Sequence, residues 1–120
     1  MDIMTRINLL RESEFSTEED YDDLCAIVRL FKEGYKIEVT EENGGFMITH
    51  MAAAFRRNRI GEEILPLDEA VWEDVTETPE FALAGEIIKA IEAQITNPIS
   101  EKERKFFFLH ICSVLAASNQ

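Results

Sequence analysis

Helical spacing of apolar residues is the feature that most constrains what this chain can fold into. In "FMITHMAAAFRRNR", residues 46–59, four apolar side chains and one histidine recur at i, i+3, i+4, i+7 and i+8, namely Met47, His50, Met51, Ala54 and Phe55. This spacing places them on one buried face of a helix. The arginines that follow suit the negative end of a helix dipole. The segment therefore predicts an amphipathic helix that begins after Gly45.

The N-terminal third of the chain shows two more helical patterns. Residues 1–11 carry Ile3, Ile7 and Leu10 on one face of a short predicted helix. A longer helix is predicted to begin at Ser16, because Ser16 and Glu19 have the spacing of a capping box, and to end at Gly34. The alternating run "YKIEV", residues 35–39, has no second alternating run to pair with, so we expect an irregular link or a helix extension.

The remaining segments are also helical in pattern. Residues 66–75 suffice for one to two turns, and Thr78 with Pro79 predicts the start of a helix that runs to Ile95. Ser100 and Glu103 form a second capping-box pattern before "KFFFLHICSVLAA", which predicts a helix buried on most sides. We therefore predict an all-α, compact bundle of about five helices. Residues 1–120 are interpreted as a single domain with no attached effector domain.

Composition and charge narrow the classes of function. A formal net charge of −12 repels phosphate backbones, so nucleic acid is not expected as a direct partner. No apolar run approaches the roughly 20 residues that span a bilayer, and no signal peptide is recognisable, so we expect a cytoplasmic protein away from membranes. Cys25 and Cys112 lie in apolar contexts and are interpreted as reduced core thiols, with a disulfide as the lesser alternative.

His50 and His110 are the residues most open to a chemical role, and spacing alone favours a packed structural role for both. No metal or cofactor is predicted, because no His-Glu-x-x-His or Cys-x-x-Cys pattern supplies further ligands. Cys112 lies two residues from His110 and faces elsewhere on a helix, and no constellation of nucleophile and base indicates an enzyme. Arg57 lies two turns after His50 on the same face, where a guanidinium suits a phosphoryl group.

The two histidine segments together resemble the PTS regulation domain, or PRD, a phosphorylatable helical module of bacterial sugar-responsive antiterminators and activators. The first motif, "THMAAAFRRNR", matches the family pattern at His50, Met51, Ala54, Phe55 and Arg57. The second, "ERKFFFLHI", matches it at Glu103, Phe106, Phe107, Leu109, His110 and Ile111. The motifs stand in the family's order with the histidines 60 residues apart, and the resemblance covers about residues 16–117.

This resemblance implies a helical bundle that forms a homodimer and accepts phosphoryl groups at His50 and His110, with Arg57 as the charge partner of the phosphate. The implied donor is the histidine phosphocarrier protein or a sugar-transporter subunit, and another regulator protein is the implied target in transcriptional regulation. Phosphorylation then acts by changing protein association, because an added charge biases an interface with two arrangements.

Two residues depart from the family pattern. Thr49 replaces the aspartate that precedes the first histidine, and Lys105 replaces a small residue of the second motif. A carboxylate beside a histidine orients the ring and stabilises its charged form, which threonine does poorly. The sequence therefore leaves a second interpretation open, in which the chain is a structural dimerisation or interaction domain that has lost phosphorylation.

Overall fold

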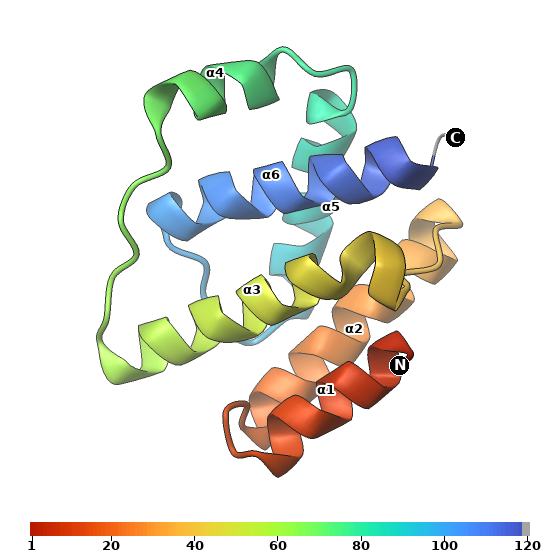
Figure 1. The fold of residues 1–120 in the computed structure, drawn as a ribbon, viewed down its shortest axis with the longest axis vertical. Coiled ribbons are helices and arrows are strands. Elements are labelled where there is room, and N and C mark those ends of the chain that lie inside the picture. The colour runs from red at the N-terminus through yellow and green to blue at the C-terminus, as the bar shows by residue number, and fades with distance from the viewer. Residues whose placement is uncertain (119–120) are drawn as a thin grey trace.

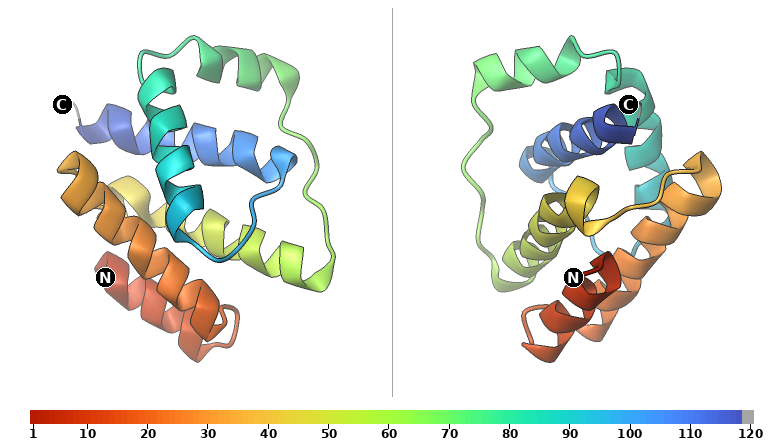
Figure 2. Two further views of the ribbon diagram at one scale, coloured as in Figure 1. Left: turned by 180° about the vertical axis from the view of Figure 1, so that it is seen from behind. Right: turned by 45° about the vertical axis from the view of Figure 1, so that its right-hand side comes forward.

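The computed structural model describes residues 1–118 and is all-helical, with no strand in that range. It contains six helices, one more than the approximate number predicted, in the order α1 (Ile3–Glu12), α2 (Glu18–Tyr35), α3 (Glu41–Ile60), α4 (Glu69–Thr76), α5 (Phe81–Gln94) and α6 (Glu101–Ser118). In Figure 1, α3 and α6 lie side by side at the front. Seen from behind, α5 crosses α6 and α2 lies against α3 (Figure 2). Helix α4 packs on α6, and its Trp72 ring also contacts the Phe81 ring of α5 at a centroid distance of 5.8 Å.

The start of α2 differs from the prediction by one residue. Thr17, not Ser16, is the N-cap, and its partner in the capping box is Asp20 rather than Glu19. Ser16 is 3 % exposed, and its backbone N–H donates to Leu10 O, so this residue closes the turn between α1 and α2. The helix also runs past Gly34 and ends where Lys36 adopts a left-handed conformation with φ of 58°.

Helix α3 begins earlier than the sequence indicated. Thr40 and Asn43 form a capping box, so Gly44 and Gly45 lie inside the first turns rather than before the helix. A Cβ at Gly44 would stand 2.5 Å from the Val39 side chain, which is itself buried. The glycine therefore serves close packing of the helix on the preceding link, and the link "YKIEV" is irregular, as expected.

The predicted side-chain cap is absent from α5 and present at α6. Helix α5 begins at Phe81 without a side-chain cap, because the Thr78 hydroxyl donates to Val75 O and closes α4 instead. In α6 the Ser100 hydroxyl accepts the Glu103 backbone N–H at 3.2 Å, as predicted. The Glu103 side chain, however, turns away from the cap and binds a residue of α3.

The core receives buried side chains from all six helices. Its largest fully buried members include Phe31, Phe55 and Phe107, from α2, α3 and α6. Cys25 is half-buried and Cys112 is buried, and within the described residues they are free thiols, as the sequence indicated. Burial of these apolar faces fixes α3 against α6, which positions both histidine motifs.

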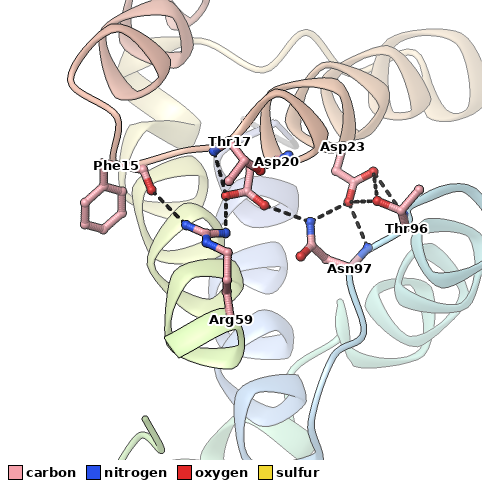
Figure 3. Close-up of polar contacts among 7 residues, drawn as sticks. All are labelled: Phe15, Thr17, Asp20, Asp23, Arg59, Thr96 and Asn97. Atoms are coloured by element: carbon pink, nitrogen blue, oxygen red, sulfur yellow. Dashed lines mark hydrogen bonds and ion pairs between the residues drawn. The ribbon is translucent and has the colours of Figure 1, made fainter. Parts of the chain in front are cut away.

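A buried carboxylate network joins the start of α2 to the α5–α6 connection (Figure 3). Asp23, 3 % exposed, accepts the backbone N–H groups of Thr96 and Asn97, each at 2.9 Å. Asp20, 1 % exposed, accepts from Arg59 Nη1 at 2.8 Å, and the Asn97 side chain donates to both aspartates. These bonds pair the two buried carboxylates and hold the backbone of the α5–α6 connection against α2.

Candidate functional site

His50 and His110 come together although 60 residues separate them in the sequence. Their ring centroids are 4.7 Å apart, with the planes tilted by 39°. His50 also stacks on Phe106, one turn before His110 on α6, at a centroid distance of 5.2 Å. The two predicted acceptor residues therefore share one site at the contact of α3 and α6.

Arg57 lies at this site, but its direct partner is a carboxylate of α6. Arg57 Nε and Nη2 donate to the two Glu103 oxygens at 2.7 Å and 3.0 Å. Glu103 is 7 % exposed, so this is a buried, bidentate ion pair. His50 Nε2 stands 3.8 Å from Glu103 Oε1, so the carboxylate lies between Arg57 and His50, and His110 contacts the His50 ring.

Burial keeps the two imidazoles neutral near physiological pH. Desolvation lowers the pKa of His50, the positive charge of Arg57 lowers it further, and the negative charge of Glu103 opposes both. The pKa of His110 is lowered to about 4, first by burial and then by the neighbouring His50. A neutral imidazole has a free electron pair on one nitrogen, so both rings are in the form that can act as a nucleophile.

The lowered pKa of His110 predicts that acid destabilises the fold. In the unfolded chain this histidine has its ordinary pKa near 6.5, so on acidification the unfolded state takes up the proton first. The contribution of neutral His110 to the free energy of unfolding is therefore fully present above pH 6.5. It falls by about 2 kcal/mol as the pH is lowered towards 4. Urea unfolding at pH 7 and at pH 4.5 measures this loss. His110→Asn should show a smaller loss over the same range, and an equal loss in both proteins would contradict the assignment.

Thr49 and Lys105, the two residues that depart from the family pattern, each contact a residue of another helix. The Thr49 hydroxyl accepts from Arg6 Nη1 at 2.8 Å, and Arg6 is also paired with Glu41. Thr49 therefore ties α3 to α1. Lys105 Nζ lies over the Trp72 ring at 5.2 Å, a cation–π contact that helps to hold α4 against α6.

Two absences apply to residues 1–118. No three histidine, cysteine, aspartate or glutamate side chains in this range are grouped closely enough to hold a metal ion. No helix in the same range has the length and apolar character of a membrane span.

With an all-helical fold and two paired histidine motifs, the chain belongs to the PRD domain family, whose model matches residues 26–114. PRD domains are regulatory modules of the phosphotransferase system and interact with its phosphocarriers. The chain is also similar to YhfY, an uncharacterised protein of Escherichia coli (strain K12). The two are 23 % identical over 116 residues, which covers 97 % of each chain. No solved structure gives a significant match.

The sequence places Glu103 in a helix cap and in the second family motif, but neither indicates that the carboxylate faces His50. A signal for it exists in the spacing. Arg57 follows His50 by seven residues, and Glu103 precedes His110 by seven residues. In two antiparallel helices whose histidines are in contact, these equal distances lead in the same direction along the helix pair. They bring Arg57 and Glu103 together two turns from the histidines.

Proposed function

We propose that this chain is a phosphoryl acceptor of the sugar phosphotransferase system, at His50 and His110, and that it acts in transcriptional regulation through protein association. The observation that carries the proposal is the 4.7 Å contact between these histidines. Each belongs to a separate family motif, and a purely structural role would not require both to meet at one site. The family's interaction with phosphocarriers supports a histidine phosphocarrier or a sugar-transporter subunit as the cytoplasmic donor.

Arg57 is the proposed contact of the phosphate. Its Nε and Nη2 atoms hold Glu103, whereas Nη1 makes no hydrogen bond to any of residues 1–118. A guanidinium can bind two anions at once through different edges. Arg57 can therefore meet a phosphoryl oxygen through Nη1 without releasing Glu103, which makes it a shared counter-charge for the carboxylate and the phosphate.

The exposed surface of α3 and α6 next to the histidines supports a homodimer. Phe46, one turn before His50, is 87 % exposed. Ser113 and Ala117 follow His110 at i+3 and i+7 and are also exposed. An exposed aromatic ring on α3 and exposed small side chains on α6 suit the close approach of a second helical surface. On this account a phosphoryl group at the histidines adds charge to the dimer interface and changes its arrangement, with a second regulator protein as the target.

Transfer of labelled phosphate tests the acceptor role. The purified chain is incubated with a phosphotransferase relay and labelled phosphoenolpyruvate, beside a known PRD regulator as positive control. We expect the chain to be labelled, and His50→Ala and His110→Ala to show how the label divides between the two sites. Absence of label under conditions that label the control regulator would reject the proposal.

A second candidate is a structural interaction domain that no longer accepts phosphate. It is favoured by Thr49, whose hydroxyl is engaged by Arg6 where the family pattern has a carboxylate beside the histidine. This candidate predicts constitutive self-association or partner binding that neither histidine substitution changes. Loss of association in folded His50→Ala and His110→Ala variants would contradict it.

A further inference from the structure

We propose that Glu103 is the positioning residue of His50, and that it directs phosphorylation to Nδ1 of that ring rather than to Nε2. This inference rests on the proposed function, because it specifies how His50 receives the phosphoryl group. Glu103 thereby supplies from α6 the carboxylate that Thr49, on α3, does not.

The environment of Nε2 is the first support. This nitrogen is buried and has no hydrogen-bond partner among the described residues, whereas the ring as a whole is 22 % exposed. Glu103 Oε1, at 3.8 Å, is the carboxylate oxygen that faces it. A contact of this length becomes a hydrogen bond after a small side-chain adjustment, as is common at sites that tighten when the partner binds. The Nε2–H group of His50 then donates a hydrogen bond to Glu103 and keeps its proton.

The rigidity of Glu103 is the second support. Arg57 binds both of its oxygens, and only 9 % of its side chain is exposed. Such a carboxylate holds its position, so it selects one tautomer and one orientation of the imidazole. With the proton fixed on Nε2, the free electron pair lies on Nδ1, the other ring nitrogen.

The transfer step follows from this tautomer. The Nδ1 electron pair attacks the phosphorus of a phosphohistidine on the donor, and a new P–N bond forms. The donor's P–N bond breaks, and its electron pair returns to the donor ring nitrogen. The Nε2 proton stays on His50, so the phosphorylated ring carries positive charge, which Glu103 stabilises.

Attack through Nε2 is disfavoured by the same geometry. A phosphoryl group on Nε2 would be placed in an enclosed space against the negative Glu103 carboxylate, and the two like charges would repel. The charged and titratable groups that face His50 are Arg57 from α3 and Glu103 and His110 from α6. The negative charge of Glu103 raises the pKa of His50 against the effects of burial and Arg57, as expected for a carboxylate aimed at the ring.

The tautomer of unphosphorylated His50 gives the first test, independent of any donor. Two-bond ¹H–¹⁵N correlation spectra of the ¹⁵N-labelled full chain should show the Nε2–H form of His50. Glu103→Gln should lose this preference and lower the measured pKa of His50, because it removes the negative charge that raises that pKa. Glu101→Gln, an exposed residue of the same helix turn, is the matched control and should change neither. An Nδ1–H tautomer in the wild type would overturn the proposal, and this spectrum decides the matter even where Glu103→Gln fails to fold.

The nitrogen that receives phosphate gives the second test. Chemical phosphorylation with phosphoramidate, followed by ³¹P and ¹⁵N NMR, should give Nδ1-phosphohistidine at His50. Glu103→Gln should slow formation of this product by roughly 10- to 100-fold, and Glu101→Gln should react like the wild type. Nε2-phosphohistidine at His50, or equal rates in the two variants, would overturn the proposal. Failure of the protein relay alone would instead count against the proposed function, because phosphoramidate does not depend on protein docking.

Discussion

Asp23→Ala is expected to lower the free energy of unfolding by about 3 kcal/mol. The Asp23 carboxylate is 3 % exposed and accepts the backbone N–H groups of Thr96 and Asn97, together with bonds from both side chains. Its removal takes the buried acceptor away from two part-buried backbone donors, and an unpaired donor that is shielded from water costs about 1–3 kcal/mol. Urea unfolding at pH 7, monitored by circular dichroism, measures the change.

The neighbouring residue provides the control for this prediction. Asp22 has the same side chain, lies in the same helix and is exposed. Asp22→Ala should therefore change the free energy of unfolding by no more than about 0.5 kcal/mol. If Asp23→Ala is as mild as Asp22→Ala, the network of Figure 3 does not hold the α5–α6 connection in place.

Arg57→Ala is expected to have the second-largest effect, a loss of about 2–3 kcal/mol. The substitution removes both hydrogen bonds to Glu103 and leaves a mostly buried carboxylate without its cation. Some access to water remains at the pair, since 20 % of the Arg57 side chain is exposed, so we place the loss below that of a fully buried ion pair. Thermal or urea unfolding at pH 7 checks it.

Two comparisons make this prediction specific. Arg104 forms a more exposed pair with Glu92 on the surface, and Arg104→Ala should cost no more than about 1 kcal/mol. The double substitution Arg57→Met with Glu103→Leu should recover most of the stability, because two apolar side chains replace the buried pair without leaving a lone charge. Equal losses for Arg57→Ala and Arg104→Ala would contradict the buried character of the Arg57–Glu103 pair.

Much of the fold follows from local patterns in the sequence. The stripe from Met47 to Phe55 predicts α3 because burial of one face every 3.6 residues has no other common solution. Its start was misplaced because two glycines suggested a loop, whereas the capping box of Thr40 and Asn43 begins the helix before them. The glycine at position 44 is required by the close approach of Val39, and such packing has no local signature.

The candidate site was predictable only in part, because contacts between distant segments also have no local signature in the sequence. His50, His110 and Arg57 were identified from motifs, but nothing local to either motif states that the two histidines touch. Their contact depends on the antiparallel packing of α3 on α6, which the whole core determines. The spacing of Ser100 and Glu103 predicts a capping box. In the structure the Ser100 hydroxyl accepts the backbone N–H of Glu103, while the Glu103 carboxylate accepts a hydrogen bond from Arg57 instead of taking part in the cap.

The Thr49 substitution is also clearer in three dimensions. A threonine before the histidine suggested altered chemistry, since the position then lacks a carboxylate. The structure gives that hydroxyl a contact with α1 through Arg6 and sets a different carboxylate, Glu103, 3.8 Å from the ring. One of the two charges that act on His50 therefore comes from Glu103, a residue 53 positions later in the sequence, and the other comes from Arg57.

The most direct measurement is the intact mass of the chain after incubation with a purified phosphotransferase relay and phosphoenolpyruvate. We predict that the wild type gains at least one phosphoryl group per chain, and that the double variant His50→Ala/His110→Ala gains none while its circular dichroism spectrum stays helical. A wild type that gains no mass while a control PRD regulator does, or a double variant that gains as much as the wild type, would contradict the account.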